Sequence, residues 1–287
     1  MTGKAYRPEP HATSRARVAA ALALAVVSGC ARLPPPDLSR DPAGLLGQVR
    51  AAQARVTSVR GPASVTLESP GQSGSLDAFV AAEKPDRIRV ELLDFFGNPA
   101  MVMAAGAGRF AVLDLRAAVF YRGEATPENL SKFLPVRVPV SDLVTLLCGS
   151  APLLDGSAAE AAEPDGEAMR LELEGPGGRE FLWVGAGATV RAATLEPRTG
   201  GAGSFWRVAF ASFAERGGAL WPAEADLRSA SARLTLHWKR GAEVNAASSP
   251  AAFALEPPRG VRVVDLSGGE VPSLDLPVRP GEGTPAG

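Results

Sequence analysis

Apolar and polar residues alternate with a period of two along much of the chain between residues 65 and 239. Ile88, Val90 and Leu92, for example, are separated by charged residues. Gly, Pro, Asn or Asp interrupts this alternation about every ten residues, which predicts about eleven strands in an antiparallel sheet with one buried face. A sheet of this size is expected to curl, because closing or half-closing it limits its exposed edges.

Apolar residues at helical spacing predict three helices. Residues 42–56 form the first, and Asp41 followed by proline is typical of a helix N-terminus. Two shorter helices are predicted in the middle of the chain, at residues 126–133, with Thr126 as the cap, and at residues 139–147. We expect these two helices to cover the open side of the sheet.

Differences in composition along the chain divide it into four segments. Residues 1–29 form a leader, residues 30–41 a tether with three consecutive prolines, residues 42–266 the folded body, and residues 267–287 a tail. Consecutive prolines favour extended, semi-rigid geometry. The tail is rich in Gly and Pro without periodicity, so we expect it to be disordered. Within the body, residues 155–167 are interpreted as a loose loop.

Cys30 follows an apolar run, residues 18–27, that ends in small residues and is preceded by a basic stretch. This arrangement is typical of a secretory signal peptide, and a cysteine at the cleavage position resembles a bacterial lipobox. The resemblance implies cleavage before Cys30, with diacylglycerol on its sulfur and an acyl chain on its new amino group. A transmembrane helix is the alternative, but the run has about half of the roughly 20 apolar residues that a span needs. A leader with plain cleavage and no lipid is the other alternative.

The net charge bears on the partners that the protein can bind, and the cysteine content bears on whether it can form a disulfide. The chain has a net charge of −1, and loss of the basic leader makes it more acidic. Nucleic-acid-binding proteins normally carry a basic patch, so we expect no nucleic-acid partner. Cys30 and Cys148 are the two cysteines. If Cys30 is acylated, the mature chain has no disulfide, and Cys148 is interpreted as a buried small hydrophobe.

The residues offer no catalytic constellation. His237 is the one histidine after the leader, and alternation predicts it on the solvent face of its strand. The chain has no P-loop, G-x-S-x-G elbow or H-E-x-x-H sequence, and too few His and Cys for a zinc site. Glu172 and Glu174 share one strand face and are interpreted as solvated. We therefore expect no enzyme activity, no metal and no cofactor other than the lipid on Cys30.

Two stretches resemble the LolA/LolB lipoprotein-carrier superfamily. One is the run from Leu92 to Pro99 (LLDFFGNP), and the other is the C-terminal pattern from Leu220-Trp221-Pro222, through Trp238, Asn245 and Phe253, to Pro257–Val261. The resemblance implies a mainly β fold: a half-open antiparallel β-barrel with an N-terminal helix and a helical lid over an apolar cavity. It also implies that Phe96, with Phe95 beside it, protrudes from a loop that contacts membrane. The alternative is that one or both rings pack inward.

These observations lead to a hypothesis of a monomeric lipoprotein, anchored in the outer membrane and facing the periplasm. The outer membrane is implied by Ala31, which resembles the non-aspartate sorting signal after the lipidated cysteine. We expect the protein to bind membrane lipid, the acyl chains of other lipoproteins, or a periplasmic carrier. The residues expected to line the cavity are Ile88, Val90, Leu92, Leu171, Leu173, Leu234, Leu236 and Trp238. Packing of these residues against the lid is the alternative. A second hypothesis is a non-catalytic scaffold lipoprotein that holds a protein partner in the cell envelope.

Overall fold

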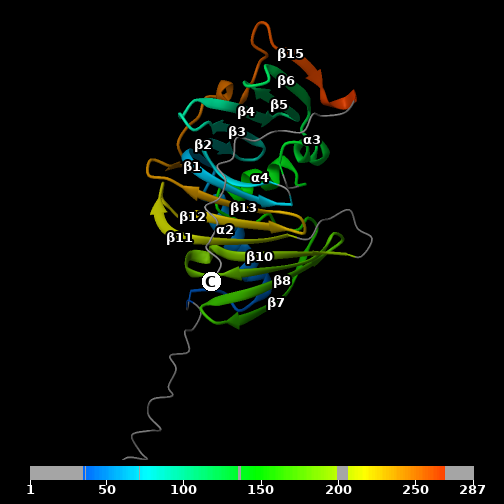
Figure 1. Cartoon of the computed structure of the whole chain (residues 1–287). Helices are drawn as coiled ribbons and strands as arrows, with labels where there is room; N and C mark the ends of the chain where they lie inside the picture. Colours follow the sequence, from blue (N-terminus) through cyan, green and yellow to red (C-terminus); the bar gives the residue numbers. More distant parts are fainter. Residues whose placement is uncertain (1–34, 36, 71, 135–136, 199–205, 269–287) are drawn as a thin grey trace, which may run out of the picture. The chain divides into compact units, whose positions relative to one another are not determined.

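The computed structural model describes residues 35, 37–70, 72–134, 137–198 and 206–268, all within the compact unit 34–287. The predicted leader, Cys30 and nearly all of the predicted tail lie outside these residues. Figure 1 shows one large sheet, viewed with its strands stacked from β15 to β7. Within the described residues, no helix is long and apolar enough to span a bilayer.

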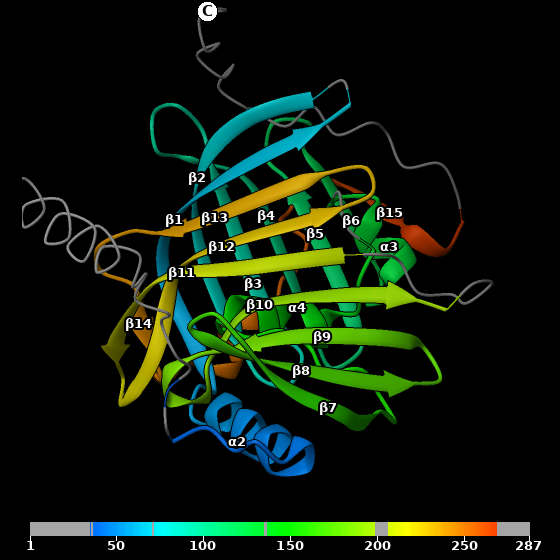
Figure 2. The ribbon, with the colours of Figure 1, turned by 90° about the horizontal axis from the view of Figure 1, so that it is seen from below.

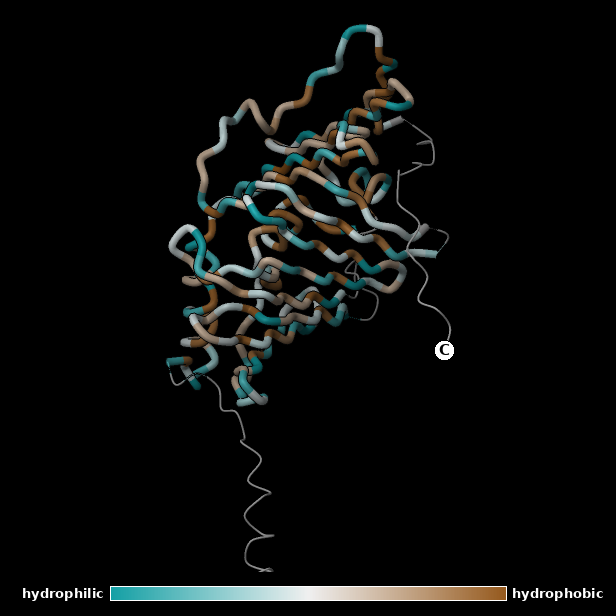
Figure 3. Tube along the Cα trace, turned by 60° about the vertical axis from the view of Figure 1, so that its left-hand side comes forward, coloured by the Kyte–Doolittle hydropathy of each residue, from teal (hydrophilic) through white to brown (hydrophobic). Residues whose placement is uncertain are grey.

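The described residues form a sheet of fifteen strands. These are β1 (Ser58–Ser69), β2 (Gln72–Glu83), β3 (Arg87–Leu93), β4 (Pro99–Gly106), β5 (Arg109–Asp114), β6 (Val119–Glu124), β7 (Ala158–Asp165), β8 (Ala168–Gly175), β9 (Gly178–Val184), β10 (Val190–Pro197), β11 (Trp206–Arg216), β12 (Ala219–Ser229), β13 (Arg233–Trp238), β14 (Glu243–Val244) and β15 (Arg262–Asp265). Figure 3 shows apolar and polar residues alternating along them.

The strand order places the first strand in the middle of the sheet. It runs β15-β6-β5-β4-β3-β2-β1-β13-β12-β11-β10-β9-β8-β7, with β14 also paired to β1. The chain therefore builds one half outward from β1 to β6, crosses to the far edge at β7, and returns to pair β13 antiparallel with β1. The two edge strands, β15 and β7, are not paired with each other, so the sheet is not closed.

The N-terminal helix α2 (Pro42–Ala54) packs beside β7 and β8, as Figure 2 shows. Its cap is the predicted one, because Asp41 Oδ2 accepts a hydrogen bond of 2.7 Å from the Gly44 backbone N–H. Leu45, Leu46 and Val49 are its buried residues. They join the second core, a cluster that also holds the inward residues of β8 to β11.

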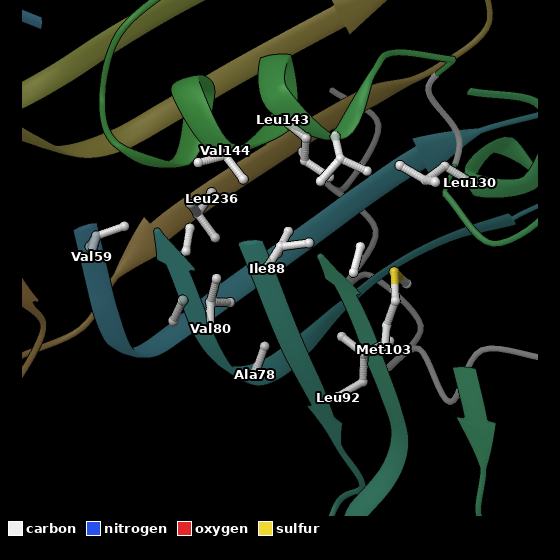
Figure 4. Close-up of a cluster of buried hydrophobic side chains, with 14 of the residues drawn as sticks. Val59, Ala78, Val80, Ile88, Leu92, Met103, Leu130, Leu143, Val144 and Leu236 are labelled. Carbon is white, nitrogen blue, oxygen red and sulfur yellow. The ribbon is translucent and has the colours of Figure 1, made fainter. Parts of the chain in front are cut away.

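Two short helices lie in the middle of the chain, as predicted. They are α3 (Pro127–Ser131), capped by Thr126 through the Asn129 N–H at 3.2 Å, and α4 (Val140–Leu147). We call them the lid helices. Figure 4 shows Leu143 and Val144 of α4 directed at strand residues such as Ile88 and Leu236. These contacts belong to the first core, which covers the inward face of β1 to β6 and continues onto β12 and β13.

The segment after β14 passes over the opposite face of the sheet, which we call the outer face. It contains the short 3₁₀ helix η2 (Pro250–Phe253), which contacts β3 and β4. The segment then forms β15, and the short 3₁₀ helix η3 (Leu266–Gly268) follows that strand. Figure 1 shows this segment in orange. Leu255 and Val261 pack there against a small third cluster, whose buried residues include Leu113 and Phe120.

The mainly β prediction with helices before and within it is confirmed, but the strand number and pairing are corrected. Fifteen strands replace about eleven, and β15 pairs parallel with β6 rather than antiparallel. The alternation pattern did not predict β7, β14 or β15. The loose loop predicted at 155–167 is wrong, because β7 occupies Ala158–Asp165. Its Ala-rich sequence does not alternate, and its register with β8 shifts between Ala159 and Ala161.

The end of the predicted tether packs against the body. Leu38 is buried in the second core, the Ser39 N–H donates to Gln48 Oε1 at 2.8 Å, and Gln48 Nε2 donates to the Asp37 carbonyl at 2.9 Å. A free spacer therefore ends before Leu38. At the other terminus, the described structure continues to Gly268, just past the predicted end of the body at residue 266.

Candidate functional site

The turn between β3 and β4 carries two exposed phenylalanines. The exposed fraction is 74% for Phe95 and 84% for Phe96, the two highest among the large apolar residues described as exposed. Their rings contact each other edge to face, with centroids 5.5 Å apart. Both rings thus point away from the cores, and the inward alternative is wrong for each of them.

Asp94 fixes the shape of this turn. Its Oδ1 accepts hydrogen bonds of 2.9 Å from the backbone N–H groups of Phe96 and Asn98, and its backbone carbonyl accepts from the Gly97 N–H. Gly97 has a φ of +83°, which favours glycine. The Asn98 N–H is the main cause that holds the pKa of Asp94 below its usual range. A charged, hydrogen-bonded carboxylate therefore supports an apolar tip.

The residues expected to line a cavity fall into two separate groups. Ile88, Leu92 and Leu236 are buried in the first core, and Val90 and Trp238 pack against it. Leu171 and Leu173 are fully buried in the second core. Leu234 belongs to neither core and is half-buried opposite Leu67 and Leu227 in register. In this structure, side chains of the lid helices and of α2 pack onto both groups.

A glycine allows the chain after α4 to approach the sheet closely. Gly149 has a φ of +81°, and a Cβ there would lie 2.5 Å from Pro222 Cδ and 2.9 Å from Trp221 Cδ1. Trp221 is 1% exposed and packs against Trp238, with the rings tilted by 53° and their centroids 5.5 Å apart. Its indole N–H has no partner among the described residues. The segment after α4 thus packs closely against β12, near the middle of the sheet.

Glu180 is a buried carboxyl that no sequence motif marks. It lies on the inward face of β9 with 0% exposure, and its Oε2 accepts from the Leu154 N–H at 2.8 Å, while Oε1 has no partner among the described residues. Burial raises the pKa of Glu180 to about 8. In the sequence, the burial of Glu180 could have been predicted from its position two residues before Leu182, which places it on the apolar face of the strand.

Other candidate chemical groups lie apart from one another. His237 is exposed and stands 3.9 Å from Glu224, as expected for the solvent face. Glu172 and Glu174 form surface ion pairs with Arg179, each at 3.1 Å. Burial raises the pKa of Cys148 to about 11, as expected for a thiol packed as a small hydrophobe. Within the described part of the chain, no three His, Cys, Asp or Glu side chains gather where a metal ion could bind.

Comparisons with known proteins support the fold. No protein-family model matches the chain, and no curated protein matches it significantly. Similar solved structures include a LolA superfamily protein from Nitrosomonas europaea, with a TM-score of 0.52, 13% identity, and coverage of 74% of this chain and 97% of that chain. A putative outer membrane lipoprotein-sorting protein domain from Vibrio parahaemolyticus gives a TM-score of 0.52 at 11% identity, over 74% and 97% of the two chains.

A DUF1329 family protein from Desulfovibrio piger also has a TM-score of 0.52, at 12% identity, covering 75% of this chain and 98% of that chain. At these identities the likeness shows a shared fold. The resemblance to the LolA superfamily is therefore supported at the level of architecture, while the roles of individual residues stay predictions.

Proposed function

We propose that this protein is a lipid-anchored outer-membrane lipoprotein that binds acyl chains of lipids or of other lipoproteins on the inward face of its sheet. The observation that carries the proposal is the pair Phe95 and Phe96, held exposed on an ordered turn. Aromatic rings favour the boundary between lipid headgroups and acyl chains. Together with acylation at Cys30, the turn would keep the sheet within reach of lipid.

Acyl binding would occur where the lid helices now pack. Leu130 of α3 and Leu143 and Val144 of α4 cover the inward face of the first half of the sheet. An acyl chain that replaced them would restore the apolar contacts that the strands lose, at about 0.8 kcal/mol per buried methylene. The lid helices are only five and eight residues long. The bound state thus requires displacement of the lid helices.

Photo-crosslinking tests this proposal in the full-length chain. Cells that make the protein are fed palmitate carrying a diazirine near the chain end, and labelled peptides are mapped after irradiation. We expect label, beyond the metabolic acyl chains on Cys30, in peptides that contain Val90 or Leu236. Val90→Phe should reduce this label several-fold, whereas Thr235→Phe, on the opposite face, should not. Label confined to the Cys30 peptide and to Phe95 and Phe96 would contradict acyl binding under the lid helices.

A scaffold is the second candidate function, and one observation favours it. The inward face is covered in this structure, while the Phe95 and Phe96 rings are exposed and could contact a protein as well as a membrane. Replacing Phe95 with a photoreactive phenylalanine analogue in the full-length chain separates the two candidates. Adducts to lipid support membrane contact, and a single discrete protein adduct supports the scaffold.

A further inference from the structure

The outer face of β4, β5 and β6 carries a recess of about 930 Å³ beneath the segment 250–257. This face is opposite to the one that the lid helices cover, and at the edge of β6 the recess reaches Thr126 and Asn129 at the start of α3. Phe120 lies in its floor, and Phe253 and Leu255 line it from the crossing segment. Small-molecule sites typically have volumes of about 300–1,000 Å³, so the recess is large enough for a ligand.

Small residues create the hollow. Ala104 and Ala111 stand directly opposite each other on β4 and β5, and Gly106 stands opposite Arg109 one step further along. Toward the other end of the same strands, the larger Val102 and Leu113, together with Phe120 of the neighbouring β6, fill the outer face. Because both alanines are small, they leave a hollow with an apolar floor, and the third cluster borders this floor on one side.

Six charged side chains also line the recess, and three of them are already paired. Arg122 pairs with Asp265 at 2.8 Å, and Arg87 pairs with Glu83 at 2.7 Å. Arg109 and Glu124 also line the recess and face each other in register across β5 and β6. Neither of these two side chains forms an ion pair with another residue in the described part of the chain. Glu256 of the crossing segment also lines the recess and forms no ion pair in the described part of the chain. One guanidinium and two carboxylates of the recess are thus available to a ligand.

We propose that this recess binds a single-chain phospholipid with a zwitterionic head group. Arg109 contacts the phosphate, because a guanidinium matches phosphate oxygens in shape and charge. Glu124 contacts the ammonium group. The acyl chain lies over Ala104 and Ala111 and ends against Leu255, which already packs on Phe120. The carboxylates of Glu124 and Glu256 beside Arg109 are what select a zwitterion over a purely anionic amphiphile.

The test uses the full-length lipidated chain in phosphatidylcholine nanodiscs and a lysophosphatidylethanolamine probe with a diazirine in its acyl chain. We expect label in peptides from residues 104–124 and 250–257. Arg109→Gln should lower this label roughly tenfold, as expected for loss of a charge-assisted hydrogen bond. Ala104→Leu should lower it by filling the hollow, and circular dichroism should show an unchanged fold. The matched control Arg240→Gln, an exposed arginine outside the recess lining, should leave it unchanged.

Competition and mapping decide between the possible results. Unlabelled lysophosphatidylethanolamine should displace the probe at lower concentration than lysophosphatidylglycerol, which lacks the ammonium group. Equal or better displacement by the anionic lipid would overturn the zwitterion assignment. Label restricted to the inward-face peptides would overturn the recess and leave the proposed function standing. If the recess is labelled only after removal of residues 269–287, the tail is its occupant and the proposal is wrong.

Discussion

Asp94 Oδ1 and the Phe96 backbone N–H are 2.9 Å apart, and this hydrogen bond ties a charged side chain to an exposed aromatic residue. The same oxygen also accepts from Asn98, so one carboxylate orders the whole tip of the β3–β4 turn. An exposed apolar residue on a disordered loop would lose conformational entropy on binding a membrane. A tip that is already ordered avoids most of that loss.

The first prediction concerns the turn. Asp94→Ala should weaken binding of residues 34–287 to lipid vesicles several-fold, because Phe95 and Phe96 then become ordered only on contact. Asp94→Asn keeps an oxygen acceptor and should bind like the wild type. The pKa of Asp94 is lower in the folded state than in the unfolded state. The charged carboxylate therefore stabilises the turn above the ordinary Asp pKa near 4, and this stabilisation is lost as the pH falls through the pKa of the folded state. Vesicle co-sedimentation measures the effect, and equal binding by Asp94→Ala would contradict it.

The second prediction concerns the aromatic rings. Phe96→Glu, with Phe95 retained, should lower vesicle binding of residues 34–287 roughly tenfold or more, because an apolar ring is replaced by a charge at the membrane boundary. Phe79→Glu provides the control, since Phe79 is 41% exposed and lies on β2 rather than on the turn. An equal loss for both variants would indicate a general charge effect. No loss for Phe96→Glu would exclude the turn as a membrane contact.

The third prediction concerns the pH dependence of stability. The pKa of Glu180 is about 8 in the folded state, above its unfolded value near 4.3, so the folded state binds the proton more tightly. The free energy of unfolding should therefore fall as pH rises from about 4.5 to 8 and level off beyond that range. Glu180→Gln should remove this slope and stabilise the protein at pH 8.5, by at most about 5 kcal/mol.

Urea unfolding at pH 4.5, 6.5 and 8.5 measures this dependence. Glu172→Gln is the control, because Glu172 lies on the opposite face of the adjacent strand β8 and pairs with Arg179. The control should keep the wild-type slope. A wild-type slope in Glu180→Gln would show that the Glu180 carboxyl is not the group responsible.

The fourth prediction concerns Cys148. The thiol is buried and its pKa is raised to about 11 by burial, so alkylation at pH 8 should be very slow in the folded protein. Alkylation should become fast in guanidinium, with a stoichiometry of one thiol in residues 34–287. Mass spectrometry after iodoacetamide treatment measures both rates. Rapid alkylation without denaturant would indicate that the segment after α4 opens readily.

The sequence predicted the strands whose side chains alternate strictly, because alternation directly reports one buried face. Ile88, Leu92 and Leu236 are buried as their pattern requires. The sequence did not predict β14, which has two residues, or β15, which has four. The partner of β15 is β6, which lies far from it in the sequence. Nor could periodicity show that β1 and β13 join the two halves at the centre of the sheet, because register between strands far apart in sequence depends on tertiary packing.

The candidate site was predictable in part. The sequence identified Phe95 and Phe96 but could not decide whether adjacent rings point inward, since a tight turn breaks the alternation that assigns faces. The exposure of both rings follows from the hydrogen bonds of Asp94, which only the structure shows. The sequence also could not separate an open cavity from packing against the lid helices, because the same apolar residues serve either arrangement.

The most direct test of acyl binding is mass spectrometry of lipid that co-purifies with the unanchored body. Residues 34–287, exported behind a leader without a lipidation cysteine, would be purified from periplasm without detergent. The account predicts about one lipid or acylated peptide per chain, or uptake of added lipid to that level. No bound lipid and no uptake of lipid or acylated peptide would contradict it.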